Sequence, residues 1–329
     1  MQTSIVFTLC SNNYLAHAKT LGDSLKKHNP DVHFIIGLVD ERDPAIDYSY
    51  FAPYEVLPYS EIGYAFFSEM LAKYNVIEFN TAVKPFYFEY IFKQYGKNSM
   101  VYYIDPDIAF YSSLESLNES LKNKNIVITP HLTKAQLPVS PFETMVLNVG
   151  IYNLGFIGIR NTEESGNFLV WWQERLKDHC YIDYARGLFV DQIWINLVPL
   201  IFKDVEVLMN PGYNMACWNF HERKLLSKEG KYFVNEEHPL VFFHFSGFKP
   251  LNMQYVSKIK TREFTLEARP DLKDLFHEYA KWLLDNDYAK FSASKPKLKF
   301  GHGKYSKKQR IGLSLKFRTN SYIKKLFGV

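Results

Sequence analysis

The stretch Met100–Asp107, MVYYIDPD, joins an apolar run to two carboxylates one residue apart. The run MVYYI is typical of a buried strand. In extended backbone residues i and i+2 point to the same side, so Asp105 and Asp107 can reach one divalent cation. Pro106 stiffens the link because its ring fixes φ and biases Asp105 away from helix. We therefore expect a site for Mn²⁺ or Mg²⁺ at a strand end, the alternative being a surface loop with two aspartates.

Strands and helices alternate around this stretch. Ser4–Cys10 and His33–Asp40 indicate short buried strands, with helical spacing from Asn13 to His28 between them. A second helix is predicted over Thr81–Tyr95, just before the Met100 strand. Further strands are predicted over 125–130, 149–160, 205–208 and 240–245, and further helices after an Asn161 cap and over 272–284. This alternation predicts an α/β fold with a mixed, mostly parallel sheet flanked by helices.

Composition limits the class of protein. The chain has 329 residues and 47% hydrophobic content, enough for one large α/β domain or two small ones. The cysteines, Cys10, Cys180 and Cys217, are scattered without a CxxC spacing, which argues against a disulfide framework or a zinc cluster. No run of 18 apolar residues and no basic leader occurs. We expect a cytoplasmic protein.

Charge divides the chain near residue 288. Residues 288–329 carry 12 Lys plus Arg and no Asp or Glu, which leaves 27 basic against 35 acidic residues in 1–287. We expect a folded domain over 1–287 and a basic amphipathic C-terminal tail over 288–329. Apolar residues recur between Ile311 and Phe327, so the tail is expected to lie on an anionic membrane surface, the alternative being a solvated tail. Because the body is acidic, no nucleic-acid partner is expected.

A second motif lies in Leu240–Pro250, LVFFHFSGFKP. An imidazole at His244 can complete the coordination of Mn²⁺, although a lone histidine on a strand is more often a core residue. Gly247 allows close backbone approach to a phosphate, and Lys249 supplies positive charge to a diphosphate. The motif therefore has the residue types of a metal-diphosphate site.

Six motifs together carry a family resemblance. They are Asn13-Tyr14 after the first strand, Lys84 in a helix, Asp105-Pro106-Asp107, Asn153-Leu154-Gly155, Asp191-Gln192, and His244-x-x-Gly247-x-Lys249-Pro250. In this order the chain resembles, over about residues 4–250, the retaining GT-A glycosyltransferases of family 8, related to glycogenin and to bacterial lipopolysaccharide galactosyl- and glucosyltransferases.

The resemblance implies a role for each motif residue. The ligands of Mn²⁺ (or Mg²⁺), which would bridge the donor diphosphate, would be Asp105, Asp107 and His244. The residues along the uracil and ribose would be Thr8, Cys10, Asn13 and Tyr14. The residues facing the phosphates or the donor sugar would be Lys84, Asp105, Gly247 and Lys249. The catalytic candidates near the reacting carbon would be Asn153, Asp191 and Gln192.

Structural alternatives stand beside these roles. Lys84 could be a solvated first-turn residue, Asn153 could turn a strand, and Asp191-Gln192 could cap a short helix. Trp218, His221 and Arg223 are candidate acceptor contacts. Two departures from the family pattern are Leu251, where a Trp is usual, and the absence of an acidic residue from the turn after the first strand.

The resemblance implies transfer of a hexose from a nucleotide-sugar, expected to be a UDP-sugar, to a glycan or lipid-linked glycan, with retention of configuration. With the basic tail, it suggests a peripheral enzyme at the inner face of a membrane. One alternative is a non-catalytic glycan-binding or scaffold protein. Another is a sugar nucleotidyltransferase, which is disfavoured because Phe7–Tyr14 lacks the glycine-rich phosphate loop usual in those enzymes.

Overall fold

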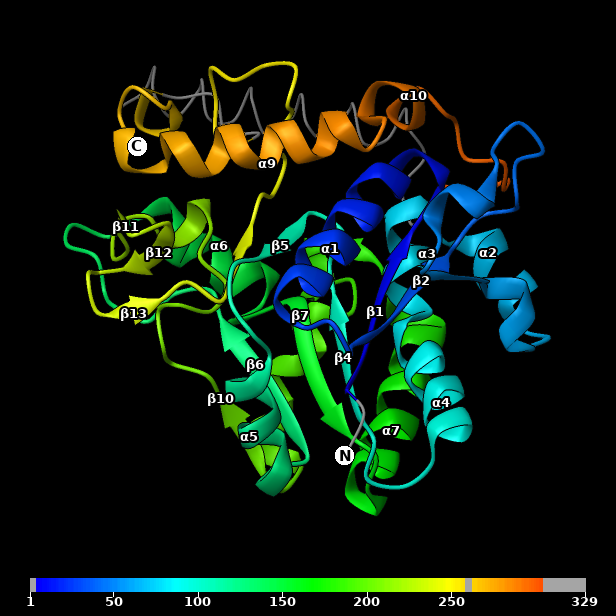
Figure 1. Ribbon diagram of the computed structural model, residues 1–329. Helices are drawn as coiled ribbons and strands as arrows, with labels where there is room; N and C mark the ends of the chain where they lie inside the picture. The colour runs from blue at the N-terminus through cyan, green and yellow to red at the C-terminus, as the bar shows by residue number, and fades with distance from the viewer. Residues whose placement is uncertain (1–3, 258–261, 304–329) are drawn as a thin grey trace, which may run out of the picture.

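A seven-stranded sheet forms the centre of the molecule (Figure 1). The computed structural model describes residues 4–257 and 262–303. The strands, in spatial order, are β10 (Val205–Val207), β6 (Ile126–Pro130), β7 (Tyr152–Arg160), β4 (Met100–Ile104), β1 (Ser4–Cys10), β2 (His33–Leu38) and β3 (Glu55–Pro58). Only β7 runs antiparallel to its neighbours in this sheet. The fold class predicted from the sequence is confirmed.

Helices cover both faces of the sheet because successive strand residues point to opposite sides. Ile5, Phe7 and Leu9 of β1 join a core with helices from one side, and Val6 and Cys10 join a core with helices from the other. The first set of helices is α3 (Val76–Ala82), α4 (Lys84–Tyr95) and α7 (Glu163–His179). The second set is α1 (Leu15–His28), α5 (Glu115–Asn123) and α10 (Tyr288–Ser292).

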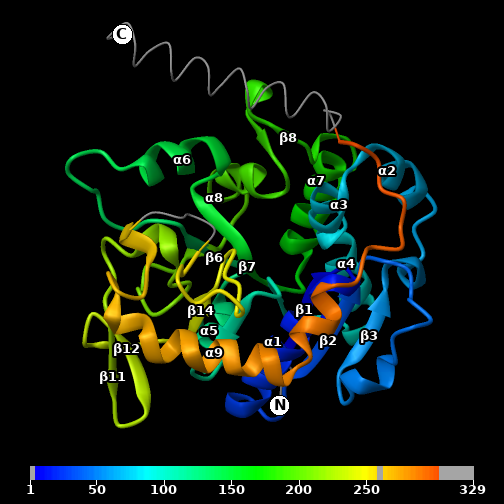
Figure 2. The same ribbon diagram turned by 90° about the horizontal axis from the view of Figure 1, so that it is seen from above.

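Smaller elements surround the end of the sheet at which its parallel strands finish. They are the paired strands β5 (Ile108–Phe110) and β14 (Phe242–His244), the antiparallel group β11 (Leu225–Lys228), β12 (Lys231–Val234) and β13 (His238–Pro239), the pair β8 (Ile182–Asp183) and β9 (Leu188–Phe189), and the helices α2 (Phe67–Lys73), α6 (Pro141–Val149) and α9 (Lys273–Asp285). The short helix α8 (Val198–Ile201) leads into β10. Figure 2 shows α9 along one side of the molecule, with α6 and α8 toward the opposite side.

Two local predictions differ from the structure. The helix predicted over 81–95 is divided, because α3 ends at Ala82 and a new helix, α4, begins at Lys84 with Pro85 in its first turn. The cap predicted at Asn161 is wrong: Thr162 is the N-cap and accepts a hydrogen bond from the Ser165 amide. The Asn161 side chain instead donates to the carbonyl oxygen of Gly96.

Residues 293–303, which follow α10 and which we call the strap, lie on the domain. After α10 the chain is tied down by the buried Asp40 carboxylate, which accepts hydrogen bonds from the amides of Lys297 at 2.8 Å and Leu298 at 3.0 Å. The predicted boundary at residue 288 stays a prediction. Residues 304–329, with the apolar residues of the predicted membrane-binding tail, lie outside the described residues. Within the described ranges, no helix is long and apolar enough to cross a bilayer.

Candidate active site

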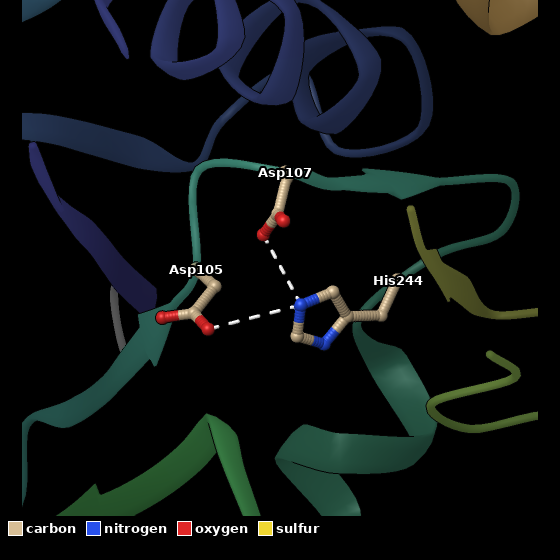
Figure 3. Close-up of side chains that lie close together, drawn as sticks. All are labelled: Asp105, Asp107 and His244. Atoms are coloured by element: carbon tan, nitrogen blue, oxygen red, sulfur yellow. Dashed lines mark ion pairs between the residues drawn. The ribbon is translucent and has the colours of Figure 1, made fainter. Parts of the chain in front are cut away.

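The turn from β4 to β5 and the pairing of β5 with β14 bring the carboxylates and the histidine together (Figure 3). Asp105 follows β4 and Asp107 precedes β5. Because β5 pairs antiparallel with β14, with Ile108 opposite His244, the imidazole lies beside the carboxylates. His244 Nε2 is 3.1 Å from Asp107 Oδ1 and 3.8 Å from Asp105 Oδ2. The three residues predicted as metal ligands therefore converge.

The geometry of this triad fits one divalent cation. One ligand atom from each residue lies within 4.8 Å of the others. Ligands at about 2.1 Å from an octahedral cation are separated by about 3 Å when adjacent and about 4 Å when opposite. Both carboxylates remain partly exposed, Asp105 at 31% and Asp107 at 20%, whereas the His244 side chain is 5% exposed. The carboxylates are thus open to a ligand while the imidazole is fixed.

The pKa values of the two carboxyl groups are shifted in opposite directions. Burial raises the pKa of Asp105, against the opposing effect of nearby Lys84 and His244. Burial alone would also raise the pKa of Asp107, but the adjacent His244 outweighs it, so the pKa of Asp107 is lowered. Asp105 Oδ1 also accepts a hydrogen bond from the Tyr103 hydroxyl at 2.5 Å, which holds its carboxylate in place. A cation between the carboxylates would relieve their mutual repulsion.

A buried amide network orients His244. Its Nδ1 lies 3.3 Å from Asn153 Oδ1, which also accepts from Asn214 Nδ2 at 3.0 Å. An Nδ1 proton donated to Asn153 leaves the Nε2 lone pair directed at the carboxylates, the tautomer that a metal-ligating histidine takes. The Asn153 Nδ2 lies 3.3 Å from His131 Nε2. Asn153 is therefore a positioning residue for the triad.

His131 and Asn214 are site residues that the sequence analysis missed. Burial lowers the pKa of His131 to about 4, so this histidine is neutral at pH 7. Its Nδ1 faces the carbonyl oxygen of Ile151 at 3.2 Å, which leaves Nε2 to accept from Asn153. A signal for His131 was present, because it directly follows strand β6, where side chains gather at the carboxyl edge of a sheet. Asn214 follows no such pattern.

Gly155 gives the triad its space. Because β7 is antiparallel to β4, the beginning of β7 lies at the same sheet edge as the end of β4, and the Asp105 amide donates to the Gly155 carbonyl at 2.7 Å. A Cβ atom on Gly155 would lie 2.6 Å from His244 Cε1 and 2.9 Å from both Asp105 Oδ2 and Asn153 Oδ1. Only glycine leaves these side chains in their observed positions.

Lys84, Asp191 and Gln192 meet around the main chain of Leu154. Lys84 forms a fully buried ion pair with Asp191 and donates to the Leu154 carbonyl at 3.0 Å. Gln192 Oε1 accepts from the Leu154 amide at 2.9 Å, and its Nε2 donates to the carbonyl of Val149. Burial raises the pKa of Asp191, against the opposing effect of Lys84. Lys84 is 1% exposed, so the alternative of a solvated helix residue is excluded.

A pocket of about 310 Å³ opens beside the carboxylates. Of the residues predicted to bind the nucleotide-sugar, those that line it are Cys10, Asn13, Tyr14 and Asp105, together with the metal candidate Asp107. Its other walls come from α3 and from Pro296 of the strap.

Four predicted nucleotide-sugar residues do not line this pocket: Thr8, Lys84, Gly247 and Lys249. Lys84 is buried in its ion pair with Asp191. Thr8, on β1 two residues before Cys10, is fully buried. Gly247, at a φ of +72°, and Lys249 lie exposed on the turn after β14. Their predicted contacts with the donor stay predictions.

A larger chamber of about 770 Å³ lies on the other side of Trp218. Trp218 and His221, two of the candidate acceptor contacts, line it. Arg223 does not. Its side chain is buried, donates to the main-chain carbonyls of Pro211 and Tyr213, and pairs with Glu222. Arg223 is therefore engaged in holding its own loop.

The chain is similar to known proteins in sequence and in fold. No family model matches it. Two proteins of Bacillus subtilis (strain 168), both described as uncharacterized, are similar in sequence: YfnF is 23% identical over 84% of this chain and 91% of YfnF, and YfnD is 26% identical over 75% of this chain and 79% of YfnD.

Among solved structures, the bifunctional glycosyltransferase WbbM matches 87% of this chain and 51% of its own with a TM-score of 0.52 at 14% identity. The galactosyltransferase LgtC, solved with donor and acceptor sugar analogs, matches 90% of this chain and 98% of its own with a TM-score of 0.48 at 15% identity. The likeness to WbbM identifies the fold as that of GT-A glycosyltransferases, as the sequence resemblance predicted.

Proposed function

We propose that this chain is a cation-dependent glycosyltransferase that takes a hexose from a UDP-sugar. The observation that carries the proposal is the convergence of Asp105, Asp107 and His244 at the carboxyl edge of a GT-A sheet, beside a pocket of about 310 Å³. In open α/β sheets, ligands bind outside the carboxyl ends of the strands. Two hard oxygen ligands with one imidazole suit Mn²⁺ better than Mg²⁺, because Mg²⁺ typically takes a shell of oxygen ligands alone.

The donor nucleotide would lie in this pocket. Tyr14, 42% exposed, offers a ring for the base, and Asn13 and Cys10 continue the wall toward the carboxylates. Thr8 would support this wall from beneath, and Gly247 with Lys249 would approach the diphosphate from the turn after β14.

The bound cation would stabilise negative charge as it develops on the departing diphosphate. The residues of this chain hold the other parts of the reaction. Asn153 keeps His244 in the ligating tautomer, and the Lys84–Asp191 pair with Gln192 fixes the first residues of β7 beneath the transferred sugar. We assign Asn153, Asp191 and Gln192 to the sugar side of the site, with retention of configuration.

We place the acceptor, a glycan or lipid-linked glycan, on the Trp218 side of the triad. The basic residues after 288 support a peripheral location on the inner face of a membrane, because clustered Lys and Arg side chains are attracted to anionic lipid.

The test is a donor screen. Release of UDP, GDP and CMP from a panel of nucleotide-sugars is followed with and without Mn²⁺ for the wild type, for Asp107→Asn and for Asp31→Asn, a surface carboxylate outside the site. We expect Mn²⁺-dependent release of UDP from one donor, reduced at least 100-fold in Asp107→Asn and unchanged in Asp31→Asn. Absence of both turnover and Mn²⁺-dependent nucleotide binding by calorimetry would instead favour a non-catalytic glycan-binding protein. Formation of a nucleotide-sugar from a nucleoside triphosphate would favour a nucleotidyltransferase.

A further inference from the structure

The chamber of about 770 Å³ beside the triad has mostly apolar walls. They come from α6, from the 3-10 helix Cys217–Asn219 and the residues after it, and from the segment 263–269. The large apolar side chains that line it are Phe142, Met145, Trp218, Phe220 and Phe264. A space of this size and lining is typical of a small-molecule site, and its apolar walls favour an apolar ligand.

Trp218 forms the wall between the chamber and the metal triad. Its ring centroid lies 5.0 Å from that of His244, with the planes at 86°, and 5.3 Å from that of His131. A group seated against Trp218 in the chamber is therefore separated from a metal ligand by a single aromatic ring. The chamber is placed to hold part of a molecule whose other part reaches the reacting centre.

Arg269 and Glu222 hold the walls of the chamber together. Arg269 pairs with Asp271 at 2.6 Å and donates to the carbonyls of Phe220 and Arg223. Glu222 accepts hydrogen bonds from the amide of Thr133, which ties the loop before α6 to the loop after Trp218. A sugar ring packed against the apolar side chains Phe142, Met145 and Phe264 would leave hydroxyl groups without partners, at about 1–3 kcal/mol for each group. An apolar occupant avoids this penalty.

The rim of the chamber continues the apolar surface outward. Leu137 and Val139, 93% and 71% exposed, lie between two residues that line the chamber, Gln136 and Ser140. Exposed apolar side chains beside an apolar cavity mark a binding surface for an apolar ligand. A chain passing from the rim into the chamber would contact both sets of side chains.

We infer that this chamber binds the aliphatic aglycone of the acceptor, with the acceptor sugar projecting past Trp218 toward the cation. The inference rests on the proposed glycosyl transfer and narrows its acceptor to glycosides that carry a long aliphatic chain. Burial of such a chain against Phe142, Met145 and Phe264 supplies affinity, and the polar sugar stays at the partly exposed carboxylates.

The test compares acceptors that differ only in the aglycone. Transfer from the donor found in the screen is measured to methyl, octyl and p-nitrophenyl β-glucosides and β-galactosides. We expect KM for the octyl glycoside to be at least tenfold lower than for the methyl glycoside of the same sugar. Met145→Gln and Phe142→Ser should each reduce this ratio to below about threefold, while donor hydrolysis without acceptor stays within twofold of wild type. Val170→Gln, an exposed residue on α7, is the matched control and should leave the ratio unchanged.

Each outcome decides the inference. Equal KM values for octyl and methyl glycosides, or a ratio that Met145→Gln leaves unchanged, would overturn it, and a preference for p-nitrophenyl over octyl glycosides would overturn the aliphatic assignment. If no donor is turned over, the proposed function fails, and saturation-transfer NMR of octyl and methyl glucoside tests the chamber separately. Octyl signals that are present in wild type and lost in Met145→Gln would support the chamber, whereas their absence from wild type would refute it.

Discussion

Replacement of Gly155 by alanine should disable the metal site without disturbing any ligand side chain chemically. The added Cβ would lie 2.6 Å from His244 Cε1, and ordinary contact begins at 3.4 Å, so the imidazole must move by about 0.8 Å. Asp105 Oδ2, at 2.9 Å from the Cβ, must move as well. Coordination distances tolerate about 0.2 Å, so a displacement of this size removes at least one ligand bond.

The expected loss is large in metal affinity and in turnover. Misorientation of a ligating histidine weakens metal binding by about 10- to 100-fold, and misplacement of a reacting group by about 1 Å reduces turnover by about 100-fold. Overpacking at Gly155 should also lower the free energy of unfolding by about 1–3 kcal/mol. The stability loss alone would leave most molecules folded at 25 °C.

The assay is Mn²⁺ titration by calorimetry with donor hydrolysis, after circular dichroism has shown that the variant is folded. Gly158→Ala, in the same strand, is the matched control, because its Cβ would meet Tyr102 and Val127 at 2.7 Å in the core. It should lose stability and keep its Mn²⁺ affinity. Wild-type Mn²⁺ affinity in Gly155→Ala, or an equal loss of affinity in Gly158→Ala, would refute the reasoning.

Three further predictions follow from buried charge and from the strap. Lys84→Met leaves Asp191 buried without its counter-charge and should lower the free energy of unfolding by about 3–5 kcal/mol in urea titrations; a Lys84→Met/Asp191→Asn double variant no more stable than the single would contradict this. His131 has its pKa lowered to about 4 by burial, so between pH 6.5 and 4 the unfolded state binds more protons and stability falls on acidification by up to about 3 kcal/mol; His131→Phe should flatten this dependence, and an unchanged slope would argue against it. Deletion of 304–329 should abolish binding to anionic vesicles and leave donor affinity unchanged, whereas deletion of 295–329 also removes a pocket wall and should weaken donor affinity about tenfold; equal donor affinity in both would show that the strap plays no part.

The sequence predicted elements best where the pattern is local. The bounds of β1 and the start of β4 agree with the predicted strands, because alternation of buried side chains is a property of consecutive residues. The predicted N-cap of α7, Asn161, lies one residue before the observed N-cap, Thr162. Asn and Thr are both good N-cap residues, so only the tertiary packing decides at which of them the helix begins. Helix α6, which lines the chamber of about 770 Å³, is not predicted from the sequence.

Site residues follow the same division. The spacing of Asp105 and Asp107 and the residue types of the His244 motif were readable from the chain, because a strand end and an i, i+2 pair are encoded by neighbours. Which distant residues meet them was not. The side chains of His131 and Asn214 contact that of Asn153, although they are 22 and 61 residues away along the chain. Such contacts depend on the order of the β-strands in the sheet.

By itself, the sequence determined the alternation of strands and helices, the carboxylate pair and the chemical types of a metal-diphosphate site. Only the tertiary structure decided that Lys84 is paired with Asp191 across 107 residues, and that Gly155 gives His244 its space. It also decided that Trp218 lies between His244 and an apolar chamber. The physical reason is that local periodicity is set by backbone geometry over a few residues, whereas strand order, register and the burial of paired charges are set by many simultaneous long-range contacts.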